Sequence, residues 1–267
     1  MSIEAINRQL ERVGYPVSDS WTLPPDCYHD REWFSHELRS VFGAGWIGVG
    51  RSDNWKEPGD YESINLGDVS IVIVMDRDGK LQALSNTCLH RGSRIVDGKG
   101  KCRALVCPFH GWSYDFSGNL LSAPRMETTQ NFDQRDFRLR SFPVEQQDGF
   151  VFCNLGGTSG SLENWLGDFH GLHAPWSLAD MVTGRRRVFD VDCNWKLFIE
   201  VFNEYYHLPY VHPDSLSDHY PEPLPTDDVI GEYTSQFGET VRNPALLVDD
   251  QEHSLPALES LEEPWCN

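Results

Sequence analysis

Two short segments each carry one cysteine and one histidine. The CLH segment contains Cys88 and His90, the CPFH segment contains Cys107 and His110, and 16 residues separate them. Two thiolates and two imidazoles suit a tetrahedral zinc ion or iron. Zinc knuckles usually combine a CxxC pair with an HxxxH pair, whereas each segment here supplies one ligand of each kind. This pairing favours a two-iron cluster with both cysteines on one iron and both histidines on the other; structural zinc and ordinary buried side chains are the alternatives.

A second candidate site lies in NEYYHLPYVH, residues 203–212. A helix through Glu204 and His207 would place both on one face, since residues i and i+3 are neighbours. Pro209 would end or kink that helix, so that His212 reaches back from the next turn. Two histidines and one carboxylate are the usual facial set of non-haem Fe(II). Taken alone, the histidines could equally be core residues and Glu204 a solvated carboxylate.

The elements that would position these residues fall into three parts. Residues 30–42 have the apolar spacing of an amphipathic helix. Short β runs follow, with hairpins expected at 69–86 and 112–124 and a further strand at 149–156. After Gly160 we expect a short helix in SLENWLGDF and a strand leading into a helix over 185–207. The pattern predicts an α+β protein divided into residues 1–43, 44–156 and 157–267.

Composition limits the possible partners and compartment. A net charge of −19 argues against nucleic acid, which needs a basic surface. No apolar run approaches the roughly 20 residues of a membrane helix, and the N-terminus lacks the apolar core of a signal peptide. These features predict a cytoplasmic protein without a membrane segment. Seven cysteines, an odd number, suggest metal ligation by a few and burial of the others.

The segments CLHRG (88–92), CPFHGW (107–112) and YDFSG (114–118) together closely resemble the Rieske family. With NEYYHLPYVH following the sequence NWK at 194–196, the chain resembles the catalytic α subunit of Rieske non-haem iron oxygenases. The resemblance implies an all-β Rieske domain inserted into a partial helix-grip-like catalytic domain. It implies a [2Fe-2S] cluster on Cys88, His90, Cys107 and His110, and a mononuclear Fe(II) on His207 and His212. Glu204 would then be a bridging acid, bonded to His207 and to a Rieske histidine of a neighbouring subunit.

One expected ligand has no clear counterpart. In the family, the third iron ligand is an acidic residue on a helix far downstream, and none of the available aspartates lies in such a segment: Asp214, Asp218, Asp227, Asp228, Asp249 and Asp250. We therefore expect a C-terminally truncated α subunit whose third ligand lies beyond Asn267. Such a chain would hold an intact cluster but little or no mononuclear iron, and it could itself be inactive.

The resemblance also implies an activity. Electrons would pass from NAD(P)H through a reductase or ferredoxin to the cluster. They would then cross a subunit boundary of a homotrimer to Fe(II). There dioxygen would be activated to hydroxylate a small organic substrate. Glutamate at the bridging position is familiar among members acting on quaternary ammonium compounds, with N-demethylation as one outcome. Tyr205, Tyr206 and Tyr210 could offer cation–π faces to such a substrate, or pack in the core. The alternatives are an aromatic-ring hydroxylating dioxygenase, a Rieske electron carrier without oxygenase activity, and a zinc-binding structural protein.

Overall fold

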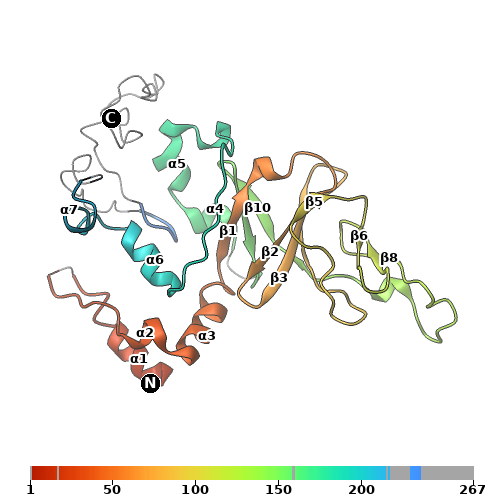
Figure 1. The fold of residues 1–267 in the computed structure, drawn as a ribbon, viewed down its shortest axis with the longest axis horizontal. Helices are drawn as coiled ribbons and strands as arrows, with labels where there is room; N and C mark the ends of the chain where they lie inside the picture. Colours follow the sequence, from red (N-terminus) through yellow and green to blue (C-terminus); the bar gives the residue numbers. More distant parts are fainter. Residues whose placement is uncertain (1, 17, 158–159, 215, 217–228, 236–267) are drawn as a thin grey trace. The chain divides into compact units, whose positions relative to one another are not determined.

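The computed structural model describes residues 2–16, 18–157, 160–214, 216 and 229–235 (Figure 1). The chain forms two compact units. The β unit comprises His36–Trp165 and Leu178–Arg186, and the helical unit comprises Met1–Ser35, Leu166–Ser177 and Arg187–Asn267.

Three antiparallel sheets make up the β unit, with strand orders β1-β11-β10, β5-β2-β3-β4-β9 and β6-β7-β8. The strands are β1 (Trp46–Arg51), β2 (Asp60–Leu66), β3 (Val69–Met75), β4 (Leu81–Ser85), β5 (Lys99–Lys101), β6 (Leu105–Val106), β7 (Ser113–Tyr114), β8 (Leu120–Ser122), β9 (Ser141–Phe142), β10 (Val144–Gln147) and β11 (Phe150–Asn154). The predicted hairpins are confirmed as β3–β4 and β7–β8, and the predicted strand at 149–156 contains β11.

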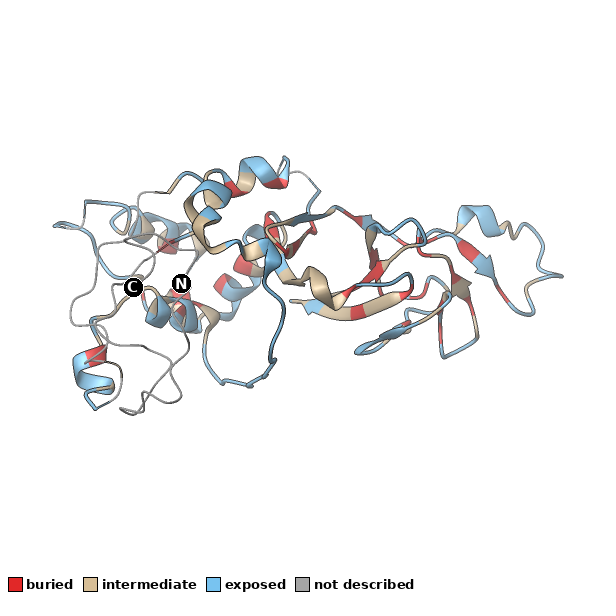
Figure 2. Ribbon diagram, turned by 90° about the horizontal axis from the view of Figure 1, so that it is seen from above, coloured by how far each residue is buried: buried red, intermediate tan, exposed pale blue. Residues whose placement is uncertain are grey.

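The central strand β3 separates two apolar cores. Side chains alternate across a strand, so Val72 and Val74 face one core while Ile71 and Ile73 face the other. All four side chains are fully buried, and buried residues lie along the strands of this unit in Figure 2. The core that contains Val72 and Val74 also contains Cys88 and Cys107. The first candidate site therefore lies against a packed interior.

The helical unit contains α1 (Ile3–Leu10), α2 (Asp26–His29), α5 (Phe169–His173), α6 (Trp195–Phe202) and α7 (Leu208–Val211). The boundaries between the two units fall within α3 (Arg31–Ser40) and α4 (Leu162–Leu166), so each of these helices has residues in both units. The helices expected near 30–42 and in SLENWLGDF are confirmed by α3 and α4. Helix α6 is tied to α2 by polar contacts: Tyr28 donates to Glu200 at 2.8 Å, and Asn194 Nδ2 donates to the Tyr28 carbonyl at 2.9 Å. Among the described residues, no helix combines the length and apolar character needed to cross a membrane.

The strand expected immediately before α6 is wrong. No strand is present between Arg185 and Asp192, and Val188 and Phe189 in this segment are about three-quarters exposed. A strand requires a neighbouring strand to bond its amides and carbonyls, and none of the described strands pairs with this segment. Alternating apolar residues are therefore not sufficient to form a strand in this segment.

Candidate metal centres

The two Cys-His segments fold into loops with the same backbone closure. The Cys88 amide donates to the Ser93 carbonyl at 2.8 Å, and the Cys107 amide donates to the Trp112 carbonyl at 2.8 Å. A glycine four residues after each cysteine donates back to the cysteine carbonyl, Gly92 at 2.9 Å and Gly111 at 3.0 Å. Both glycines have positive φ, 69° and 73°, which a residue with a side chain adopts only with strain. The shared closure explains why each segment continues with glycine.

Both cysteines are buried beside a tyrosine. Cys88 and Cys107 are 3% and 2% exposed, and the Tyr114 hydroxyl lies 3.3 Å from Cys88 Sγ. That hydroxyl also accepts a hydrogen bond from the Leu89 amide at 3.1 Å. Burial raises the pKa of the Cys107 thiol, but hydrogen bonds from the backbone of Phe109 and from neighbouring groups outweigh it, so that the pKa lies below its usual value. This favours the thiolate, the form that binds metals.

The two histidines of these loops form the other half of the site. The ring centroids of His90 and His110 are 4.6 Å apart, and His90 stacks on Trp112 at 5.0 Å with an interplanar angle of 8°. Burial, followed by the charges of His110 and Arg91, lowers the pKa of His90, which keeps it neutral. Its buried Nδ1 has no hydrogen-bond partner among the described residues. A neutral imidazole with a free buried nitrogen is ready to bind metal, so the thiol pair and the imidazole pair fit a [2Fe-2S] cluster.

The second candidate site is built from a turn and not from a continuous helix. Helix α6 ends at Phe202, and α7 begins at Leu208 with Pro209 in its first turn. The expectation that one helix carries Glu204 and His207, and that Pro209 ends it, is therefore wrong. Proline lacks the amide hydrogen that the first turn of a helix leaves unbonded, so Pro209 starts a helix here instead.

Within this turn, Glu204 holds His207 by two contacts. Glu204 Oε1 lies 2.5 Å from His207 Nδ1, and Oε2 accepts from the His207 amide at 3.1 Å. Burial raises the pKa of Glu204, but its contacts with His207 outweigh burial and lower it overall. The rings of His207 and His212 have centroids 5.6 Å apart. A carboxylate on Nδ1 leaves Nε2 of His207 for a metal, the arrangement common for ligating histidines.

The remaining residues expected near this site are only partly described. Of the six aspartates considered for the third ligand, Asp214 is described; Asp218, Asp227, Asp228, Asp249 and Asp250 lie outside the described residues. The described residues contain no group of three or more His, Cys, Asp or Glu side chains placed for one metal ion. Tyr206 and Tyr210 are each 77% exposed, so the core alternative is wrong for these two tyrosines.

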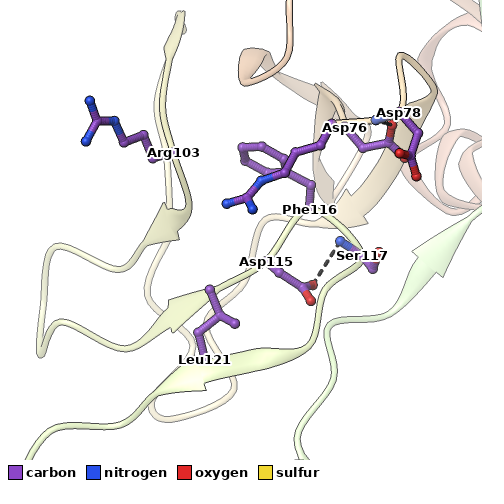
Figure 3. Close-up of a pocket in the computed structure, with 8 residues that line it drawn as sticks. Asp76, Asp78, Arg103, Asp115, Phe116, Ser117 and Leu121 are labelled. Atoms are coloured by element: carbon purple, nitrogen blue, oxygen red, sulfur yellow. Dashed lines mark hydrogen bonds between the residues drawn. The ribbon is translucent and has the colours of Figure 1, made fainter.

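A separate cavity of about 320 Å³ opens between the β3–β4 and β7–β8 turns (Figure 3). Its lining residues are Asp76, Arg77, Asp78, Arg103, Asp115, Phe116, Ser117 and Leu121. Asp76 and Asp115 each accept two backbone amides of their own turn, for example the Ser117 amide at 2.9 Å from Asp115. These carboxylates stabilise the hairpin turns, and no expected metal ligand lines the cavity.

Sequence reasoning did not identify the stacking of Trp112 on His90 or the buried hydrogen bonds of Asn86 at the base of the first loop. In the sequence, the only signal for Trp112 is its place in the CPFHGW segment. For Asn86, the available signal was a polar residue between a strand and a candidate ligand.

Two family profiles match the chain. The Rieske [2Fe-2S] domain matches residues 45–143, and the ring-hydroxylating alpha subunit (catalytic domain) matches residues 178–263. The chloroplastic choline monooxygenase of Arabidopsis thaliana is 34% identical over 214 residues, covering 76% of this chain and 51% of the relative. The carnitine monooxygenase oxygenase subunit of Escherichia coli strain K12 is 32% identical over 223 residues, covering 82% and 59% respectively. The chain thus spans between about half and three-fifths of the length of these relatives.

Solved structures show the same architecture. The quaternary ammonium Rieske monooxygenase CntA, in complex with the inhibitor MMV12, matches with a TM-score of 0.74 and 28% identity over 79% of this chain and 59% of that one. Naphthalene 1,2-dioxygenase from Rhodococcus sp., bound to indole, matches with a TM-score of 0.73 and 25% identity over 83% and 52%. The predicted α+β fold with an all-β Rieske domain is confirmed by these likenesses.

Proposed function

Since the chain belongs to the family of Rieske non-haem iron oxygenase α subunits, we propose that it acts as a terminal oxygenase component that hydroxylates a small organic substrate with dioxygen. The observation that carries this proposal is the pair of matched loops, which present two buried cysteines together and two histidine rings 4.6 Å apart. The Glu204–His207 contact supports a second metal position in the helical unit. An electron carrier has no need of this second position.

The proposed ligands are divided between two centres. Cys88, Cys107, His90 and His110 would hold the [2Fe-2S] cluster, and His207 and His212 would hold Fe(II). When bound, the cluster supplies single electrons and the mononuclear iron supplies the activation of dioxygen. Glu204 fixes the tautomer of His207 by accepting the Nδ1 proton, and its second oxygen holds the His207 backbone. We propose that Glu204 also links the two centres across the subunits of a homotrimer.

For the substrate, we propose a quaternary ammonium compound. Relatives named for choline and carnitine oxidation support this class, as does glutamate at position 204. The exposed rings of Tyr206 and Tyr210, 6.3 Å apart, are faces that can attract a cationic ammonium group. Hydroxylation of an N-methyl group would lead to its loss as formaldehyde. NAD(P)H, through a reductase or ferredoxin, is the proposed source of electrons.

A second candidate function is dihydroxylation of an aromatic ring. The likeness to naphthalene 1,2-dioxygenase, with a TM-score of 0.73, is the observation that favours it. The two candidates share every ligand residue and differ in the substrate.

The test is oxygen uptake by the purified chain with a reductase, NADH and one substrate at a time from choline, carnitine, other betaines and naphthalene. We expect a red-brown protein with a Rieske electron paramagnetic resonance (EPR) signal and, in preparations that also hold mononuclear iron, uptake that depends on a quaternary ammonium substrate. The His207→Ala variant should keep the EPR signal and lose the uptake. Uptake with naphthalene alone would favour the second candidate. A reducible cluster without substrate-dependent uptake, in a preparation that does hold mononuclear iron, would identify a carrier, and a colourless zinc protein would overturn both candidates.

A further inference from the structure

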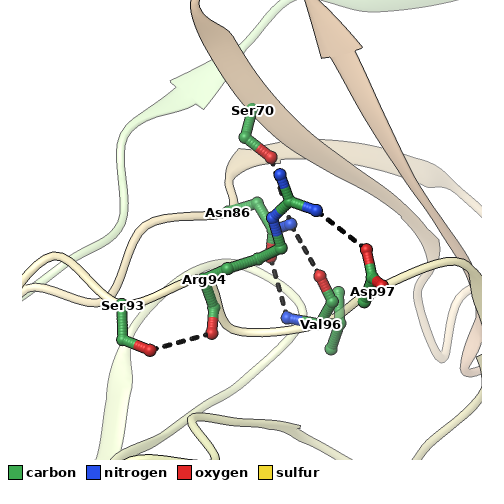
Figure 4. A network of polar contacts seen from close by, with 6 residues as sticks. All are labelled: Ser70, Asn86, Ser93, Arg94, Val96 and Asp97. Carbon is green, nitrogen blue, oxygen red and sulfur yellow. Dashed lines mark hydrogen bonds and ion pairs between the residues drawn. The ribbon is translucent and has the colours of Figure 1, made fainter.

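Asn86 lies at the end of β4, at the base of the loop that carries Cys88 and His90. Its side chain is fully buried, and it pairs with the peptide groups of Val96 on the other side of the loop (Figure 4). The Val96 amide donates to Asn86 Oδ1 at 3.0 Å, and Asn86 Nδ2 donates to the Val96 carbonyl at 2.8 Å. The backbone carbonyl of Asn86 accepts from the Ile95 amide at 3.1 Å. Asn86 thus closes the loop with both its backbone and its side chain.

The same residue attaches the loop to the central sheet. Asn86 Nδ2 also donates to Ser70 Oγ at 3.3 Å, and the Asn86 amide donates to the Ser70 carbonyl at 3.0 Å. Ser70 lies on β3, whose neighbours Val72 and Val74 pack in the core that contains Cys88. A primary amide has two N–H donors and one carbonyl acceptor, and all three groups of Asn86 are used here. No other side chain of this size offers the same set.

Inside this closure, the Ser93 carbonyl accepts from the Cys88 amide and the Gly92 amide donates to the Cys88 carbonyl, while Ile95 packs in the same core as Cys88. By contrast, the nearby ion pair of Arg94 and Asp97 is on the surface, with the side chains 50% and 82% exposed. Buried hydrogen bonds restrain a loop more than exposed ion pairs do, because water competes for the latter. The buried amide is therefore the restraint that holds the base of the loop.

We propose that Asn86 is a positioning residue that sets the geometry of the first ligand loop, and through it the placement of Cys88 and His90 relative to Cys107 and His110. This inference rests on the proposed [2Fe-2S] site. Outer residues that orient metal ligands commonly change metal affinity by about 10–100-fold when they are replaced.

The test compares Asn86→Ala with Asn154→Ala. Asn154 is 1% exposed in the same unit, and its Oδ1 accepts from the Gly157 amide at 2.8 Å, so it also closes a loop, but one without ligands. The readouts are the g-values of the dithionite-reduced cluster and the rate at which EDTA bleaches its colour. We expect N86A to shift the g-values and to bleach about tenfold faster than wild type. N154A should match wild type in both, even if its unfolding midpoint falls.

If N86A does not fold, Asn86→Gln takes its place in the test. Glutamine keeps both N–H donors and the carbonyl acceptor but places them one methylene further from the backbone, so we expect shifted g-values with a smaller increase in bleaching. Wild-type behaviour of either Asn86 variant, or equal changes in N154A, would overturn the inference. So would the failure of both Asn86 variants to fold while N154A folds, because Asn86 would then be required for folding itself. Wild-type protein without a Rieske signal would overturn the proposed function and this inference together.

Discussion

The two ligand regions differ in how much of their geometry their own surroundings supply. In the β unit, Cys88 and Cys107 are almost completely buried, each loop is closed by two backbone hydrogen bonds, and Tyr114 contacts one sulfur. In the helical unit, the side chains of His207 and Glu204 are 22% and 41% exposed, and the preceding helix α6 leaves five large apolar side chains exposed: Leu197, Phe198, Ile199, Val201 and Phe202.

This difference indicates which contacts each region depends on. The first region is held by a packed core and by many bonds, so only the loss of a ligand should abolish it. The second region depends mainly on one carboxylate that orients one histidine, so the loss of that carboxylate should have a large effect.

Replacing Cys107 by serine should abolish the [2Fe-2S] cluster completely, because the serine hydroxyl does not replace a thiolate on iron. Visible absorption and EPR of the purified variant measure the loss. Cys102→Ser is the matched control, since Cys102 is half-buried against the same core and is not one of the proposed ligands. Full cluster content in C107S would exclude Cys107 as a ligand.

Glu204→Gln should weaken metal binding at His207 and His212 by about 10–100-fold while leaving the cluster intact. Glutamine has a single acceptor oxygen, so it cannot accept from both Nδ1 and the backbone amide of His207, and it lacks the negative charge that strengthens the contact. Titration with Co(II), followed by absorption, measures the affinity separately from activity. Glu200→Gln is the control on the preceding helix, because Glu200 contacts Tyr28 and not His207. Equal effects of both variants would contradict a specific role of Glu204.

Tyr114→Phe should lower the reduction potential of the cluster by ~40 mV, because one hydrogen bond to sulfur contributes about 1 kcal/mol and favours the more negative reduced state. Protein-film voltammetry measures the potential. Tyr61→Phe is the control, since Tyr61 packs against the same core but its hydroxyl lies beside Gly100 on β5. An unchanged potential in Y114F would show that the contact at 3.3 Å does not stabilise the sulfur.

The smallest expected effect is on protein stability and concerns the Tyr28–Glu200 hydrogen bond, which attaches α6, the helix before the second region, to α2. Burial, followed by the hydrogen bond to Glu200, raises the pKa of Tyr28 to about 12, above the ordinary value of 10.0. The folded state therefore keeps the phenol proton more tightly, so this stabilisation is complete below pH 10 and is lost as the pH rises from 10 to 12. Urea unfolding across this range should show a loss of about 1 kcal/mol, allowing for solvent around the tyrosine. The Tyr28→Phe variant should lack this loss of unfolding free energy. An identical dependence of the unfolding free energy on pH in both proteins would contradict the prediction.

Local pattern was sufficient for much of the fold. The short β run VSIVIVMD and the DRDGK turn that follows it predicted the β3–β4 hairpin, because a strand pair joined by a short turn needs little else. The same reasoning failed for RRRVFDVD, where no described strand supplies a partner. It also failed at Pro209, since a proline near a helix end can stop one helix or start the next, and only the surrounding turn decides which.

The sequence alone specifies the candidate ligand types, their spacing and the glycines that let each loop close, because these follow from side-chain chemistry and local backbone geometry. It is the basis for the prediction that Cys88, His90, Cys107 and His110 form one set although 16 residues separate the two segments. Tertiary packing alone stacks His90 on Trp112, places the Tyr114 hydroxyl near Cys88 Sγ and lets Asn86 close the first loop against β3. These contacts depend on how the sheets pack around a common core, and spacing along the chain carries no information about that packing.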